Sequence, residues 1–172
     1  MKFIETSQEL NAFFLSEFRK HASLYGILAG ANSNFPYFFE LSDQDSKIKK
    51  LCIGLYNTDT SPTFINEFFT SNNVRYFYPT RGLSLLNLIL FYSTPEDWSI
   101  IFGNFSLDQA SFSDQPMGIW ILDSRSVEAS EIAVKFINQI DYYFERSFRF
   151  SEEEYENYWK EWDRTRMRSG SL

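Results

Sequence analysis

The single histidine of the chain, His21, limits the metal and acid–base chemistry that the sequence can support. Most zinc sites and most catalytic triads require histidine. His21 falls on the apolar side of a predicted helix, so we interpret it as a packed histidine without a catalytic role. The single cysteine, Cys52, lies in the apolar run Leu51–Leu55 and has no basic neighbour, a pattern that predicts a buried and unreactive thiol.

Motifs that bind metals or phosphates are not found in the sequence. Asp43 and Asp45 are two residues apart, but a calcium loop that began at Asp43 would have Ile48 where glycine is needed and Gly54 where glutamate is needed. The seven glycines do not have the spacing of a phosphate-binding loop. We therefore predict no catalytic residue, no metal and no cofactor, and we expect that the protein is not an enzyme. A pair of acids assembled from distant positions, as in glycosidases, stays open because such a pair is set in space.

Negative charge is concentrated in the middle of the chain. The net charge is −7, and residues 94–145 contain nine acids and two bases, so 9 − 2 = 7 accounts for the whole excess. This segment disfavours nucleic acid as a partner and favours a basic protein. The hypothesis is a partner-binding surface made by five acids of this segment: Asp108, Asp114, Asp123, Glu128 and Glu131. The alternative is that these acids are scattered over a solvated face.

Length and composition predict one globular domain over residues 1–172, with 169–172 as a frayed tail. Hydrophobic residues make up 44% of the chain and aromatic residues 19%, which is enough to build a core. The first residues lack the apolar region of a secretory signal, and the longest apolar stretch, 83–92, is too short to span a membrane. We therefore expect a cytoplasmic protein that does not contact a membrane.

Hydrophobic periodicity and capping signals predict helices that alternate with strands. The predicted helices cover residues 6–25, 61–69, 94–103, 126–146 and 151–168. The predicted strands cover residues 35–41, 48–56, 74–78 and 117–122, and we interpret the ambiguous segment 83–92 as a helix start followed by a strand. The expected fold class is α+β: one mixed or antiparallel sheet of about four to five strands, with helices packed on it and helices at both termini.

The last predicted helix has Tyr155, Tyr158, Trp159 and Trp162 on one face. These aromatic residues are expected to dock the helix onto the core. The alternative is that they form a groove for a partner, because Trp and Tyr are favoured anchors at interfaces. The edge of the sheet is another possible contact, through addition of a strand from a partner.

The general character of the chain resembles the immunity proteins of bacterial toxin systems, in particular those of contact-dependent growth inhibition. The resemblance covers the whole chain: it is small, acidic and aromatic-rich, and it lacks catalytic motifs. Residues 101–108 and 118–121, followed by an amphipathic helix, are also similar to a broader superfamily of immunity domains. The resemblance implies a cognate toxin domain, often a basic nuclease, whose active site the protein would cover. Two other functions remain open: a non-enzymatic adaptor or self-assembling subunit, and an enzyme whose carboxylates and tyrosines meet only in the folded chain.

Overall fold

The computed structural model describes residues 1–55, 59–78, 87–113, 118–125 and 131–169. The strands in this part of the chain are β1 (Lys2–Phe3), β2 (Ser23–Leu28), β3 (Ile48–Gly54), β4 (Val74–Phe77), β5 (Asn87–Thr94), β6 (Asp97–Gly103) and β7 (Ile119–Asp123). The helices are α1 (Ser7–Lys20), α2 (Phe38–Asp43), α3 (Pro62–Glu67), α4 (Gln109–Ser113), α5 (Glu131–Arg146) and α6 (Glu152–Ser169), with a short 3₁₀ turn at Asp45–Lys47. Among the described residues, no helix is both long and apolar enough to cross a membrane.

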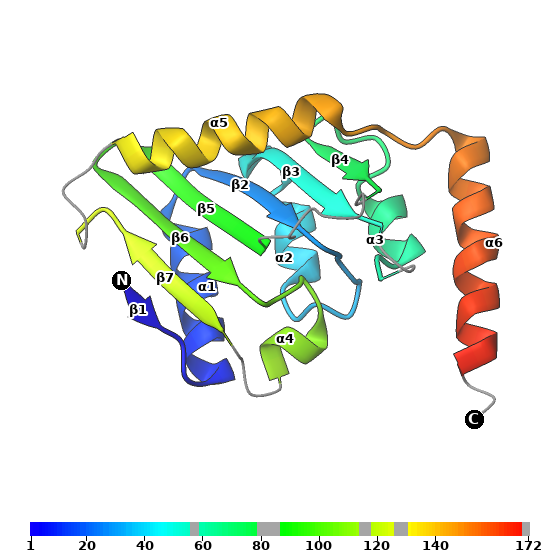
Figure 1. Ribbon diagram of the computed structural model, residues 1–172, viewed down its shortest axis with the longest axis horizontal. Coiled ribbons are helices and arrows are strands. Elements are labelled where there is room, and N and C mark those ends of the chain that lie inside the picture. The colour runs from blue at the N-terminus through cyan, green and yellow to red at the C-terminus, as the bar shows by residue number, and fades with distance from the viewer. Residues whose placement is uncertain (56–58, 79–86, 114–117, 126–130, 170–172) are drawn as a thin grey trace.

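The strands form a single mixed sheet in the order β1-β7-β6-β5-β2-β3-β4 (Figure 1). The pairs β2–β3 and β3–β4 are parallel, and the other neighbouring pairs are antiparallel. The described residues therefore form an α+β fold with seven strands, and the expectation of four to five strands is wrong. The outer edge of β4 is partly covered, since Tyr76 and Phe148 exchange two backbone hydrogen bonds of 2.8 Å. Strand addition by a partner would have to displace this contact at that edge.

Helices cover both faces of the sheet (Figure 1). On β5, Ile89 and Phe91 belong to the core beneath α1 to α4, whereas Leu88 and Leu90 belong to the core beneath α5. This alternation follows from the two-residue period of a strand. A strand buried on both faces reads as a continuous apolar run, which explains why periodicity alone left residues 83–92 ambiguous. The structure shows strand from Asn87 onward, and residues 83–86 lie outside the described part.

Several predicted helix starts are confirmed by their capping contacts. The Thr6 hydroxyl accepts a hydrogen bond of 3.2 Å from the Glu9 amide, and the Ser61 hydroxyl accepts one of 3.2 Å from the Phe64 amide. At α6, the Glu154 carboxylate accepts a hydrogen bond of 2.9 Å from the Ser151 amide, as a capping box requires. Helix α5 is confirmed from Glu131 to Arg146, and its predicted first turn lies outside the described residues.

Three predicted elements are wrong. The predicted helix at 94–103 is a tight turn followed by β6, because a capping hydroxyl, a proline and acidic residues are also typical of turns. The predicted strand at 35–41 is largely the short helix α2. The first helix ends at Lys20, and the residues that follow form β2, between β3 and β5. In each case, pairing or packing with distant residues overrides the local preference.

Cys52 is fully buried, as its apolar neighbours predict. Burial raises the pKa of its thiol to about 12. A thiol with this pKa remains protonated at neutral pH, so Cys52 is part of the core and not a nucleophile.

Helix α6 lies at one end of the molecule, next to α3 (Figure 1). Its docked side carries Tyr158, which is 4% exposed and donates a hydrogen bond of 2.7 Å to the Thr60 carbonyl. Tyr155 packs edge-on against Phe69, with ring centroids 5.7 Å apart. The predicted aromatic docking of the last helix is therefore confirmed for these residues, whereas Trp159 is 45% exposed on another side of the helix. The predicted tail begins at Ser169, which ends α6, and residues 170–172 lie outside the described part.

Candidate functional site

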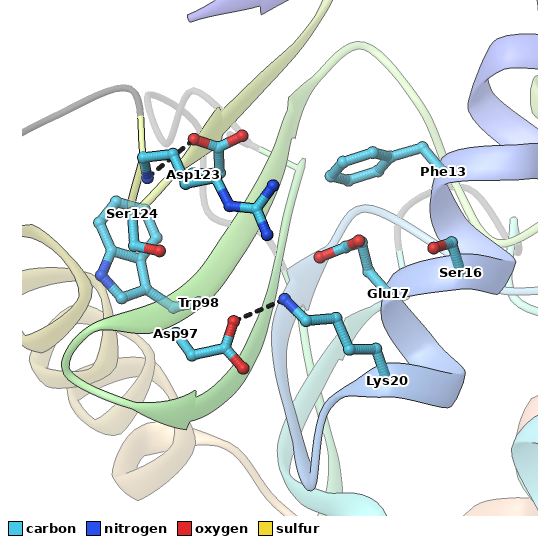
Figure 2. A pocket seen from close by; sticks show the side chains of 9 residues that line it. Phe13, Ser16, Glu17, Lys20, Asp97, Trp98, Asp123 and Ser124 are labelled. Carbon is cyan, nitrogen blue, oxygen red and sulfur yellow. Dashed lines mark hydrogen bonds and ion pairs between the residues drawn. The ribbon is translucent and has the colours of Figure 1, made fainter.

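A cleft with both acidic and basic residues opens where the end of α1 meets the start of β6 and the end of β7 (Figure 2). Its volume is about 270 Å³. We refer to it as the charged cleft. The residues that line it are Phe13, Ser16, Glu17, Lys20, Asp97, Trp98, Asp123, Ser124 and Arg125.

Strand register brings the acids of β6 and β7 to the same side of the sheet. Asp97 and Ser99 are two residues apart on β6, so they share a face. Ser99 pairs with Asp123 across the β6–β7 ladder, which places Asp123 on that face as well. The same face packs against α1, whose Phe14 and Phe18 are buried in the core.

A buried polar network holds Glu17 at the wall of the charged cleft. The Ser99 hydroxyl donates a hydrogen bond of 2.7 Å to Glu17 Oε2, and His21 Nε2 lies 3.0 Å from the same oxygen. The hydrogen bond from His21, followed by the one from Ser99, lowers the pKa of Glu17 against the opposing effect of burial. Glu17 is therefore ionised at neutral pH, and since a carboxylate only accepts, His21 Nε2 carries a proton.

The other ring nitrogen of His21 is also occupied. Nδ1 lies 3.1 Å from the Ser93 hydroxyl oxygen, and the same oxygen accepts a hydrogen bond of 3.3 Å from the Ala22 amide. The imidazole is 2% exposed. The ring is thus fixed in place between α1 and β5, in agreement with the predicted packed histidine.

A serine, a histidine and a glutamate in contact are also the groups of a nucleophilic triad. Here Ser93, His21 and Ser99 do not line the charged cleft, whose wall is formed by Glu17 and its neighbours. A nucleophile must face the space that the substrate occupies. The geometry of the described residues therefore favours a positioning role for His21 and the two serines.

Oppositely charged residues lie together at the rim of the charged cleft. Lys20 Nζ lies 2.5 Å from Asp97 Oδ1, and Figure 2 shows this pair across the opening from Asp123. Asp123 Oδ1 accepts a hydrogen bond of 3.0 Å from the Arg125 amide, which fixes the turn after β7. The charged cleft therefore combines three carboxylates, Glu17, Asp97 and Asp123, with the two cations Lys20 and Arg125.

Asp108, Asp123 and Glu131, the predicted partner-binding acids within the described residues, lie apart from one another in the structure. Asp108 follows the other end of β6 and caps α4, accepting a hydrogen bond of 2.7 Å from the Ser111 amide. The Asp108 carboxylate also acts on Asp59. The pKa of Asp59 is raised first by burial of its carboxyl group and then by the negative charge of Asp108. Glu131 begins α5 on the opposite face of the sheet, where its carboxylate lies 3.9 Å from Lys135.

Of the three predicted acids that the structure describes, only Asp123 lines the charged cleft. Asp114 and Glu128 lie outside the described residues. Glu17 was not among the residues predicted to form a site, and Asp97 was predicted to be part of a helix start. The spacing of four between Glu17 and His21 on one helix face was the available signal for the first, and no local signal pointed to the second.

No group of three or more metal-ligating His, Cys, Asp or Glu side chains occurs in the part of the chain that the structure describes. In comparisons with known proteins, no family model matches the chain and no curated protein is significantly similar to it. We therefore infer the chemistry of the charged cleft from its own residues.

Proposed function

We propose that this protein binds a basic protein partner, and that it serves as the immunity protein of a bacterial toxin domain. The observation that carries the proposal is the convergence of Glu17, Asp97 and Asp123 on one cleft from three separate elements. Carboxylates accept the charge-assisted hydrogen bonds that arginine and lysine side chains donate. Because Lys20 and Arg125 line the same cleft, the three carboxylates exceed the cations by one, and a single cationic side chain of the partner would balance this excess.

The size of the charged cleft favours a side chain over a small-molecule substrate. Its volume of about 270 Å³ is below the range of roughly 300–1,000 Å³ that is typical of pockets for drug-sized ligands. Glu17 is held ionised and in position by His21 and Ser99 before any partner arrives. A preorganised acceptor loses little conformational freedom on binding, which favours affinity.

An entering cation would compete with Lys20 for Asp97. The side chains of this pair are 43% and 42% exposed, and exposed ion pairs contribute only about 0.2–1 kcal/mol. An arginine of the partner can form two parallel hydrogen bonds with a carboxylate, which a lysine cannot do. An arginine of the partner can therefore replace Lys20 as the cation that binds the Asp97 carboxylate.

The net charge of the chain supports the choice of a basic partner. An overall charge of −7 attracts a basic protein over long range and speeds association at low salt. The resemblance to immunity proteins is the reason for proposing a toxin domain among basic proteins, with neutralisation by covering the active site. A nuclease is the favoured kind of toxin because its phosphate-binding surface is basic.

The test is binding of the purified protein to the product of the gene next to its own, with a matched pair of variants. The cleft variant Asp97→Asn/Asp123→Asn removes two negative charges from the charged cleft. The control Glu131→Gln/Glu145→Gln removes two exposed negative charges from α5. We expect wild type and control to bind a basic toxin and suppress its toxicity, and the cleft variant to bind at least about tenfold more weakly, mainly through faster dissociation, because both variants lose the same net charge.

Equal affinity of the cleft variant and the control would show that the charged cleft is not the binding surface. Absence of any toxicity to suppress would overturn the immunity role itself. The two results are separable, since the first concerns the site and the second concerns the partner.

A further inference from the structure

Phe13 differs from the other phenylalanines of α1 in how its ring is used. Phe14 and Phe18 are fully buried in the core, and Phe14 packs edge-on against Phe91 with ring centroids 5.5 Å apart. Phe13 is half-buried and lines the charged cleft. Within the described residues, its ring is not paired with another aromatic ring or with a cation. Part of the Phe13 ring therefore faces the charged cleft.

The ring of Phe13 and the carboxylate of Glu17 enter the charged cleft from the same side. The two residues are four apart on α1, so they lie one turn from each other on one face of the helix. Figure 2 shows both side chains pointing from α1 into the opening, with Asp97 and Asp123 on the other side. A group that occupies the charged cleft therefore meets an aromatic ring as well as carboxylates.

A guanidinium group is the cation whose shape suits a ring and carboxylates together. It is planar and weakly hydrated, donates hydrogen bonds in its plane and stacks on aromatic rings with its faces. The ammonium group of lysine is a compact and strongly hydrated charge without a flat face. The chain contains an example of the combined contact: the guanidinium carbon of Arg75 lies 4.3 Å from the centre of the Phe144 ring, and Nη1 donates a hydrogen bond of 3.2 Å to the Phe144 carbonyl. The combination of a ring and oxygen acceptors at Phe13 favours arginine in the same way.

The cations of the chain itself leave the Phe13 ring available. Lys20 is paired with Asp97, and neither Lys20 nor Arg125 lies over an aromatic ring of the described residues. Their two charges balance two of the three carboxylates, so the charged cleft keeps one excess negative charge. The excess charge and the available ring both favour a single arginine of the partner as the occupant.

We propose that Phe13 gives the charged cleft its specificity for arginine over lysine, by stacking on the guanidinium group that the carboxylates of the cleft bind. The inference rests on the proposed function, since it concerns the same cleft, and it adds the kind of side chain that the partner must present. Phe13 acts through its aromatic face and not through its volume. A leucine at this position keeps most of the apolar volume and loses the aromatic face, so an experiment can separate the two roles.

The test measures binding of two small probes to the full chain by NMR: N-acetyl-argininamide and N-acetyl-lysinamide, which each carry one positive charge at neutral pH. Wild type should bind the arginine probe at least about fivefold more tightly than the lysine probe. Phe13→Leu should reduce this preference to less than about twofold and change the affinity for the lysine probe by less than about twofold. Phe13→Tyr keeps an aromatic ring and should retain the preference.

Phe39→Leu is the matched control. It makes the same change on α2, where the ring is 77% exposed and does not line the charged cleft, so the preference should stay as in wild type. Asp97→Asn/Asp123→Asn should weaken binding of both probes by a similar factor, because the probes carry the same charge.

Two kinds of result would overturn the inference, and they are distinguishable. Equal affinity of wild type for the two probes, or a preference that Phe13→Leu retains, would overturn the role of Phe13 and leave the charged cleft as a cation site. Absence of binding of either probe would overturn the charged cleft as a cation site, and the role of Phe13 with it.

Discussion

The charged cleft and helix α6 are built in different ways. In the charged cleft, Glu17, Asp97 and Asp123 come from α1, β6 and β7, and hydrogen bonds fix each carboxylate or its neighbours. Helix α6 is a single element, on which Tyr158 is buried and Trp159 is 45% exposed. The geometry of the charged cleft therefore depends on the whole sheet, whereas the relative positions of side chains on α6 depend on helical periodicity.

This difference predicts how far the structural effect of a substitution extends in the molecule. A substitution that weakens the docking of α6 should displace that helix as a unit and leave the charged cleft intact. A substitution in the hydrogen-bond network around Glu17 should change the charged cleft and leave α6 in place. The following variants test the two halves of this comparison.

The largest effect on stability is expected for Tyr158→Ala, which removes the most deeply buried anchor of α6. Loss of a buried aromatic side chain costs about 3–5 kcal/mol, and the Thr60 carbonyl loses its donor. Urea unfolding should show the loss, with affinity at the charged cleft preserved in the folded fraction. Tyr158→Phe, which loses only the hydroxyl, should cost about 1 kcal/mol. A Tyr158→Ala protein as stable as wild type would contradict the docked position of α6.

An intermediate effect is expected for Glu17→Gln. The change removes the charge that accepts hydrogen bonds from His21 and Ser99, and we expect a loss of about 1–3 kcal/mol at pH 7. Because folding lowers the pKa of Glu17, its carboxylate stabilises the native state above the ordinary glutamate pKa of about 4.3, and this contribution is lost as pH falls through the lowered value.

Urea unfolding from pH 7 to pH 3 measures this dependence. The stability difference between wild type and Glu17→Gln should shrink as the solution becomes more acidic. Glu153→Gln, an exposed glutamate of α6, serves as the control and should stay within about 0.5 kcal/mol of wild type at every pH. A difference that is constant with pH would mean that Glu17 is not the ionised centre of the network.

The smallest effect on stability is expected for the Lys20–Asp97 ion pair. Both side chains are partly exposed, so a double-mutant cycle with Lys20→Met and Asp97→Asn should give a coupling of about 0.2–1 kcal/mol that salt weakens. The same variants should have opposite effects on partner binding: Lys20→Met removes a competitor for Asp97 and should strengthen it, and Asp97→Asn should weaken it. A coupling well above 1 kcal/mol would show that a cation from a partner cannot replace Lys20.

Local signals in the sequence were sufficient for elements whose contacts are close along the chain. The starts of α1, α3 and α6 depend on hydroxyl and carboxylate groups within three residues of each other. The burial of Cys52 follows from its apolar neighbours. Such features need only local backbone geometry, so they can be predicted from sequence.

The number of strands and the location of the acids were decided by tertiary structure. Strand β2 follows α1 without a strong signal and is held between β3 and β5, and Thr94–Asp97 forms a turn because β5 and β6 pair with each other. Charge counting identified the acidic segment but not its geometry: Asp97 begins β6, Asp108 follows the other end of β6, and Asp123 lies opposite Ser99. By itself, the sequence determined the starts of α1, α3 and α6, the burial of Cys52 and the net charge of this protein, because these depend on composition and on neighbouring residues. Only the tertiary structure decided which carboxylates meet Glu17, because strand register joins residues that are far apart in the chain.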